Sequence, residues 1–216
     1  QWINTEYIPL YNSKYEIQFE FINNVMEGEN VFDALFGTRN VFPPIPENEN
    51  NCNNILLGFY ETGCFSYAKT EQTNLELTTP NTLYTVKIVA NKLYVKNNET
   101  GDFELKSKLD RYEFEADLPL YLFCENHNGS AYGQCAVKLH YFKIYDKLGT
   151  EYVLARYFIP VINKATNEVC LFDRVSKTFF NNLGTDTFIA GPEKSSEDIV
   201  SDYSDCIDLA QDILGN

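Results

Sequence analysis

The chain has 216 residues and a formal net charge of −14 at pH 7, and 15% of its residues are aromatic, with 16 Phe and 15 Tyr but a single Trp. The strong negative charge argues against nucleic acid or an anionic membrane as the main partner, because both bind basic surfaces. No stretch approaches the roughly 18 consecutive apolar residues of a membrane span, so membrane insertion is not expected. A chain of this length can form one all-β domain or two small ones with a sizeable core.

The chain starts at Gln1, directly in a predicted strand, without a signal peptide or an initiating Met. This start predicts a processed or partial chain.

The cysteines contain no CxxC pair, which excludes zinc-ribbon and thioredoxin-like sites. Cys124 and Cys135 can face each other across a hairpin, and so can Cys52 and Cys64. We instead expect small buried hydrophobic residues, because a large core needs no disulfides. The cysteines are Cys52, Cys64, Cys124, Cys135, Cys170 and Cys206.

Alternation of apolar and polar residues predicts strands through the first half of the chain. The clearest is KYEIQFEFI over residues 14–22, in which every second residue is apolar or aromatic. The stretch FPPIPENENNCNN breaks the pattern and predicts a solvated insertion. The other predicted strands cover residues 1–10, 31–37, 55–60, 64–68, 74–79, 83–90 and 93–96, and residues 103–114 are predicted as a strand with a loop inside.

Residues 118–161 contain three apolar-aromatic runs separated by turn-rich breaks at 125–133 and 146–150. This composition predicts antiparallel strands joined by hairpin loops. The alternation changes phase within the middle run, where Tyr141 precedes Phe142. A phase change predicts a β-bulge between these two residues, which would bend the strand over a curved sheet.

A hairpin over 169–174 and 177–181 and a last strand over 187–190 complete a predicted β domain, residues 1–192. Residues 193–216 differ, because they contain seven acidic residues and one basic residue. Their apolar residues recur at helical spacing, which predicts a short acidic amphipathic helix. The helix would pack on its own sandwich or dock to another subunit or protein. Its predicted apolar positions are Ile199, Tyr203, Cys206, Ala210 and Ile213.

Several stretches resemble, in order, the concanavalin-A-like (laminin-G-like, lectin-like) jelly-roll modules of gut bacterial surface and phage proteins. They are QWINTEYIPLYNSKYEIQFEF, ALFGTRN, NKLYVKN, LPLYLFCENHNGSA, VKLHYFKIYD, ARYFIPV and EVCLFDRVSKTFFNNLGTDTFIAGPE, which together cover nearly all of residues 1–192. The resemblance implies an all-β sandwich of two curved antiparallel sheets whose first and last strands meet at one edge. It also implies a module carried within larger adhesins, fibres or glycan-active enzymes. The strand that usually precedes the first one is expected to be missing, and the acidic tail lies outside the family pattern.

Glu16, Gln18 and Glu20 share one face of the predicted strand over 14–22. Some jelly-roll glucanases carry Glu-apolar-Asp-apolar-Glu on such a strand, with the two glutamates as nucleophile and acid/base. Retaining hydrolysis requires two carboxyl groups about 5 Å apart. Gln18 replaces the central Asp here, and no Trp platform is available besides Trp2. A solvated strand face is therefore the preferred interpretation, and hydrolysis by Glu16 and Glu20 is an alternative.

Other catalytic sites find no support in the sequence. The two histidines, His127 and His140, form no HxH or HExxH motif, and no GxSxG, GxxxxGK[ST] or GxGxxG stretch occurs. Lectin-like jelly rolls often hold one Ca²⁺ in their loops. This chain has no DxDxDG-like cluster, so we expect no cofactor, keep one bound Ca²⁺ as the alternative and assign no metal ligands.

Carbohydrate binding requires aromatic faces for sugar C–H groups and amides or carboxylates for hydroxyl groups, which loops at one rim of a sandwich can supply. The alternative for each candidate is a turn residue that satisfies its own backbone. The candidates are Asn126, His127, Asn128 and Tyr132 in the 125–133 loop, Tyr60 and Tyr67 around a turn, and Arg39 with Asn40.

The sequence thus predicts a non-catalytic, extracellular recognition or adhesion module that binds a glycan or surface protein on a phage particle or bacterial surface. The first alternative is a structural virion fibre or capsid-decoration domain that forms homo-oligomers or docks through residues 193–216. The second alternative is the glycoside hydrolase.

Overall fold

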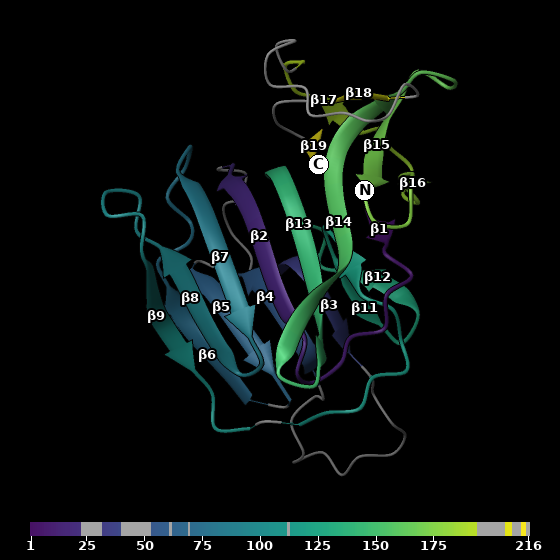
Figure 1. Ribbon diagram of the computed structural model, residues 1–216. Helices are drawn as coiled ribbons and strands as arrows, with labels where there is room; N and C mark the ends of the chain where they lie inside the picture. The colour runs from purple at the N-terminus through teal and green to yellow at the C-terminus, as the bar shows by residue number, and fades with distance from the viewer. Residues whose placement is uncertain are drawn as a thin grey trace.

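The computed structural model describes residues 1–22, 32–39, 53–60, 62–68, 70–111, 113–193, 206–208 and 213–214. These residues form two large, open β-sheets that stack face to face (Figure 1). No helix occurs in these ranges, so the prediction of an all-β sandwich is confirmed. No helix in the described part of the chain is long and apolar enough to cross a membrane.

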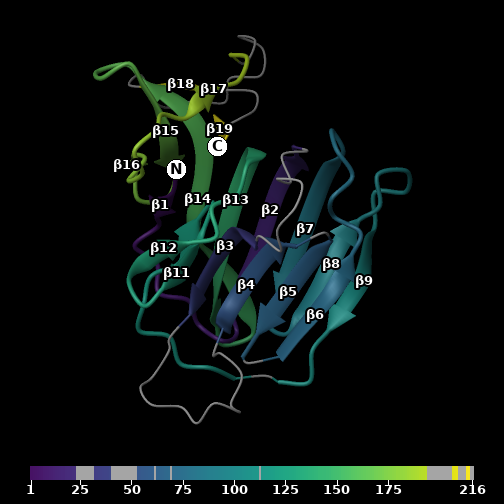
Figure 2. The ribbon, with the colours of Figure 1, turned by 180° about the vertical axis from the view of Figure 1, so that it is seen from behind.

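The first sheet, sheet A, lies at the front in Figure 2. Its main path contains β1 (Ile3–Asn4), β10 (Tyr121–Leu122), β3 (Asp33–Arg39), β4 (Asn53–Phe59), β5 (Gly63–Tyr67) and β6 (Thr70–Leu75). The strands on this path pair antiparallel. A hairpin of β11 (Glu125–His127) and β12 (Ser130–Tyr132) joins the sheet through parallel pairing of β11 with β3.

The second sheet, sheet B, lies at the front in Figure 1. Its main path contains β16 (Thr178–Phe180), β15 (Glu168–Asp173), β14 (Glu151–Asn163), β13 (Val137–Leu148), β2 (Lys14–Phe21), β7 (Leu83–Val89), β8 (Lys92–Lys96) and β9 (Phe103–Lys108). The chain passes repeatedly between the two sheets, which is compatible with a jelly-roll sandwich.

The N-terminal segment meets the late part of the β domain. The Leu183 amide donates to the Trp2 carbonyl at 2.9 Å, and the Trp2 amide donates to Asn182 Oδ1 at 3.0 Å. The two ends of the predicted 1–192 domain therefore lie side by side.

Most predicted strands form where alternation is regular. In β2 each apolar side chain is buried and each polar one is only partly buried, because successive side chains point to opposite faces. Three predictions were wrong. The break at 125–133, predicted as a loop, forms β11 and β12 around a tight turn. The strand placed at 74–79 instead covers Thr70–Leu75, and Asn74 near its end has a left-handed φ of 63°. The first strand shrinks from residues 1–10 to Ile3–Asn4.

The predicted bulge in β13 exists but lies one residue earlier. Leu139 pairs with Phe19 and Tyr141 with Gln18, so His140 is the additional residue. His140 and Tyr141 consequently both point away from the core, whereas the prediction placed Tyr141 with the buried set. Phe142 then returns to the core. The phase change was read correctly from the sequence, but its position was wrong.

The helix predicted over 193–216 is wrong at the residues that the structure describes there. Cys206–Asp208 form β18, which pairs with residues 161–163 of β14, and Ile213–Leu214 form β19, which pairs with β17 (Ile189–Ala190) and with Lys138 of β13. Pairing between β13 and β14 starts only at Phe142 and Phe158. The strand edges beyond that point have backbone groups that need partners, and these short strands supply them. The other residues of the predicted helix lie outside the described residues.

Four cysteines, Cys64, Cys124, Cys135 and Cys170, are buried. For these four, the prediction of small buried hydrophobic residues is confirmed. The side chains of Cys52 and Cys206 lie outside the described residues. Burial raises the pKa of the Cys124 thiol to about 12, so this group is un-ionised at neutral pH.

One aromatic cluster joins the two sheets around Phe142. The centroid of its ring lies 5.0 Å from that of Phe36 in sheet A, and 6.3 Å from those of both Tyr15 and Phe158 in sheet B. All four side chains are fully buried. Such aromatic pairs contribute about 0.5–1.5 kcal/mol each beyond the area that they bury.

The first prediction concerns this cluster. Phe142→Ala is expected to lower the free energy of unfolding by about 3–5 kcal/mol, because it leaves a cavity between the sheets. Phe142→Leu is expected to cost less, since it refills most of that space. The measurement is urea denaturation at pH 7. Tyr11→Ala, at a 42% exposed position, serves as the control and is expected to change stability by about 0.5 kcal/mol or less. A loss below about 1 kcal/mol for Phe142→Ala would contradict its central role.

Candidate functional site

Three strands of sheet A bring the best candidate residues together. In the register of β3, β11 and β12, His127 lies between Arg39 and Ser130, and Glu125 lies between Gly37 and Tyr132. Side chains at paired positions point to the same face of a sheet. Gly37 also pairs with Leu56, which faces away from the main core. The outer face of sheet A therefore presents the hairpin surface, which we define as Arg39, Tyr60, Glu125, His127 and Tyr132.

A buried ion pair forms the base of the hairpin surface. Arg39 Nε lies 3.1 Å from Glu125 Oε1, and the two side chains are 14% and 0% exposed. Glu125 Oε2 has no hydrogen-bond partner among the described residues. Burial raises the pKa of the Glu125 carboxyl to about 7, although the Arg39 guanidinium opposes this shift. The carboxyl therefore changes charge near neutral pH.

Two aromatic side chains lie at solvent beside this ion pair. Tyr132 is 52% exposed, and the His127 ring meets it edge-on at a centroid distance of 5.7 Å. Burial, and secondarily the charge of Arg39, lower the pKa of His127. The imidazole is therefore neutral at pH 7, with one nitrogen able to donate and the other able to accept. An aromatic ring beside such groups can bind a sugar ring together with its hydroxyl groups.

Tyr60 belongs to the same surface through Phe32. Tyr60 is 39% exposed, and its ring packs on Phe32 at a centroid distance of 4.9 Å. Phe32 lies against two glycines, Gly58 and Gly133. A Cβ on Gly58 would approach the Phe32 ring to 2.8 Å, and one on Gly133 would approach the Phe32 carbonyl to 2.7 Å. Only glycine allows this close approach, which fixes the position of Tyr60.

Two predicted site residues, Asn126 and Tyr67, are buried and have structural roles, and a third, Asn128, lies in the hairpin turn. Asn126 is buried, its Nδ2 donates to the Pro119 carbonyl at 2.7 Å, and its Oδ1 accepts from the Gly129 amide at 2.8 Å. Asn128 has a left-handed φ of 51° within the hairpin turn. Tyr67 is 1% exposed in the core, and its hydroxyl donates to the Tyr11 carbonyl.

The structure thus collects Arg39, Tyr60, His127 and Tyr132 on one surface, whereas Asn40 lies outside the described residues. Sequence reasoning missed Glu125. Its partner Arg39 is 86 positions away, and no local pattern announces a parallel pairing of β11 with β3.

The carboxylates of β2 lie on the outer face of sheet B. Glu16 accepts from the Tyr141 hydroxyl at 2.9 Å and lies 3.5 Å from Lys143 Nζ. Glu20 lies 3.3 Å from Lys138 Nζ and 3.2 Å from His140 Nε2. Each carboxylate therefore has its own cation and its own second partner. Between them, Gln18 Nε2 donates to Thr85 Oγ1 at 3.1 Å.

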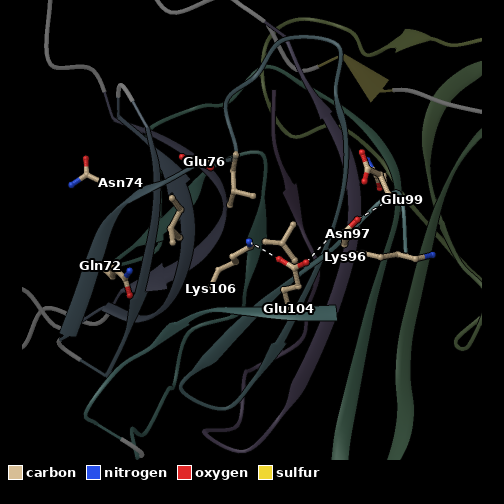
Figure 3. Close-up of a pocket in the computed structure, with 12 residues that line it drawn as sticks. Gln72, Asn74, Glu76, Lys96, Asn97, Glu99, Glu104 and Lys106 are labelled. Carbon is tan, nitrogen blue, oxygen red and sulfur yellow. Dashed lines mark hydrogen bonds and ion pairs between the residues drawn. The ribbon is translucent and has the colours of Figure 1, made fainter. Parts of the chain in front are cut away.

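A cleft of about 550 Å³ opens at the edge of the sandwich between β6 and the β8–β9 pair (Figure 3). Within it, Glu104 accepts from Asn97 at 2.7 Å and pairs with Lys106 at 2.8 Å. Such an exposed ion pair contributes little stability, about 0–1 kcal/mol. None of the described residues that line the cleft is aromatic, so they offer no stacking surface for a sugar. Its lining residues are Gln72, Asn74, Leu75, Glu76, Leu77, Val95, Lys96, Asn97, Asn98, Glu99, Glu104 and Lys106.

Among the residues that the structure describes, no group of three or more His, Cys, Asp or Glu side chains is arranged to hold a metal ion. No known protein family matches the chain, and no characterised protein has a significantly similar sequence. The described residues define an all-β, two-sheet sandwich with an aromatic and polar surface on the outer face of sheet A.

The second prediction concerns Glu125. Its pKa is higher in the folded protein than its ordinary value of 4.5, so the folded state binds the proton more tightly. The associated stability is fully present below pH 4.5 and is lost as the pH rises toward 7. We expect the free energy of unfolding of the wild type, relative to Glu125→Gln, to fall by about 3 kcal/mol over this range.

The measurement is urea denaturation at several pH values. Burial also raises the pKa of Asp33, to about 6, but this group is present in both proteins and cancels in the difference. Parallel stability profiles for the wild type and Glu125→Gln would contradict the prediction.

Proposed function

We propose that this protein is a non-catalytic, concanavalin-A-like recognition module that binds glycans through the hairpin surface. The observation that carries the proposal is the exposed Tyr132 ring, held by His127 beside the buried Arg39–Glu125 pair. The ring offers an apolar face, His127 offers a donor and an acceptor, and Arg39 offers a fixed set of donors. Shallow sites of this kind suit the end of a glycan chain.

The sandwich supports the same proposal. Its strand order is compatible with a jelly roll, and the sequence resembles lectin-like modules of gut bacterial surface and phage proteins. In this proposal the protein is displayed outside the cell, on a phage particle or a bacterial surface. The hairpin surface rests on paired strands, so the candidate residues are held without a ligand and little ordering is required on binding.

The third prediction tests this surface. The wild type is expected to bind a subset of a glycan array, and Tyr132→Ala to weaken that binding about tenfold, as expected for loss of an aromatic contact at the centre of a site. Tyr132→Phe keeps the ring and is expected to retain most of the affinity. Tyr11→Ala removes another exposed tyrosine, distant in the sequence, and serves as the control. Absence of wild-type binding across bacterial and host polysaccharides would count against the proposal.

A second candidate is a structural role in a virion fibre or capsid decoration, without glycan binding. The observation that favours it is that β18 and β19 pair with the edges of β14 and β13. The same edges could instead accept a strand from another subunit. This role predicts an oligomer by light scattering that is altered when residues 193–216 are deleted. A monomer, with unchanged particle assembly after the deletion, would contradict it.

A third candidate is glycoside hydrolysis, favoured by the common face of Glu16, Gln18 and Glu20 on β2. The test is release of reducing sugar from polysaccharides by the wild type and by Glu20→Gln. Equal release by both proteins would exclude a catalytic role for Glu20.

A further inference from the structure

A second surface lies on the opposite side of the sandwich from the hairpin surface. We call it the lysine face; it is the outer surface of sheet B, visible at the front in Figure 1. Strand register places Glu16 of β2 between Lys87 of β7 and Lys143 of β13. The same row continues to Tyr94 of β8 on one side and to Tyr157 of β14 on the other. The row therefore crosses five neighbouring strands.

The lysine face is cationic on a strongly acidic protein. Where β2 pairs with β7 and β13, four lysines point from it, Lys14, Lys87, Lys138 and Lys143, against two carboxylates, Glu16 and Glu20. The net charge of the whole chain is −14. From so acidic a composition one would expect an acidic sheet face, and this face is instead rich in lysine.

Two of these four lysines have no carboxylate as an ion-pair partner among the described residues. Lys143 pairs with Glu16 and Lys138 pairs with Glu20. Among the described residues, neither Lys14 nor Lys87 forms an ion pair with a carboxylate. Burial lowers the pKa of Lys14, the charge of Glu16 opposes this shift, and the charges of Lys87 and Lys143 add to it. Lys14 therefore lies within electrostatic reach of both lysines as well as of Glu16.

Aromatic rings hold the ammonium groups in position. Lys14 Nζ lies 3.6 Å from the centroid of the Tyr145 ring, and Lys87 Nζ lies 3.9 Å from that of Phe103. Lys143 Nζ lies 4.5 Å and 4.9 Å from the Tyr141 and Tyr157 rings. Cation–π contacts restrict side chains that would otherwise be flexible. The positive charges are thus positioned before a ligand arrives, which reduces the entropy lost on binding.

We propose that the lysine face binds an acidic polysaccharide, with its carboxylate or sulfate groups on Lys14 and Lys87 and its hydroxyl groups on Glu16 and Gln18. Glu16 and Glu20 favour a polysaccharide over a nucleic acid as the anionic ligand. Sugar hydroxyls require acceptors, which Glu16 and Glu20 supply between the lysines. A nucleic acid has few free hydroxyl groups along its chain, so it would leave these acceptors without donors.

This inference goes beyond the proposed function in both the place of the site and the class of ligand. Lys14 lies opposite Val89, two residues along β7 from Lys87, so the two lysines are diagonal neighbours about 7–8 Å apart that one extended chain can contact together. The hairpin surface, by contrast, presents two exposed tyrosine rings and a single, paired arginine.

The experiment uses the full chain. Binding to immobilised polygalacturonate, dextran sulfate, uncharged dextran and oligothymidylate is measured by biolayer interferometry at several salt concentrations. The wild type is expected to bind at least one of the two acidic polysaccharides, with an affinity that falls as salt rises, and not to bind dextran. Lys14→Gln/Lys87→Gln is expected to lose about tenfold in affinity and part of the salt dependence. Lys14→Arg/Lys87→Arg keeps both charges and is expected to retain binding.

The matched control is Lys164→Gln/Lys177→Gln, which removes the same charge from two exposed turns near β15 and is expected to bind as the wild type does. Thermal melting confirms that each variant is folded. The inference is overturned if the wild type binds neither acidic polysaccharide, if it binds oligothymidylate more tightly, or if the Lys→Gln pair and its control behave alike. Tyr132→Ala is expected to leave this binding unchanged, so failure here and failure of the hairpin surface are separate results.

Discussion

The additional residue His140 in β13 is the constraint on which both the core and the face of sheet B depend. A strand without a bulge would continue the alternation from Leu139 and turn Phe142 away from the core. With the bulge, His140 and Tyr141 both face outward and Phe142 returns between the sheets. The same register change delivers His140 to Glu20 and the Tyr141 hydroxyl to Glu16. One irregularity therefore fixes the aromatic contact between the sheets and the polar contacts outside.

The parts of the fold that sequence reasoning predicts are those set by local alternation. β2 follows its pattern because one of its faces packs on the core and the other faces solvent. The phase change in β13 was visible for the same reason, although its position was not, because Tyr141 is apolar enough to suit either face. The Arg39–Glu125 pair could not be predicted, since it depends on the parallel pairing of β11 with β3. Tyr67 was predicted as a binding residue but lies in the core, because a tyrosine beside a turn can equally be a core residue.

The tail shows how tertiary pairing overrides a helical pattern. Apolar spacing over residues 193–216 favours a helix, but propensity is a weak preference worth fractions of a kcal/mol per residue. Unpaired strand groups at the separating ends of β13 and β14 cost more, about 1–3 kcal/mol for each buried group left without a partner. Short extended segments at Cys206–Asp208 and Ile213–Leu214 satisfy such groups. Nothing within the tail sequence itself indicates that these edges exist, so only the assembled sheet decides the outcome.

The two outer faces of the sandwich differ in how their charges are balanced. On the outer face of sheet A, Glu125 is buried against one guanidinium and its protonation is sensitive to pH near neutrality. On that of sheet B, Lys14 and Lys87 rest on aromatic rings rather than on carboxylates. A cation over a ring keeps most of its charge available, whereas one paired with a carboxylate does not. This difference is why an anionic ligand is proposed for sheet B and an uncharged sugar suits the hairpin surface. Because each surface is built on its own strands, we expect substitutions on the outer face of sheet B to leave the hairpin surface on sheet A unaltered.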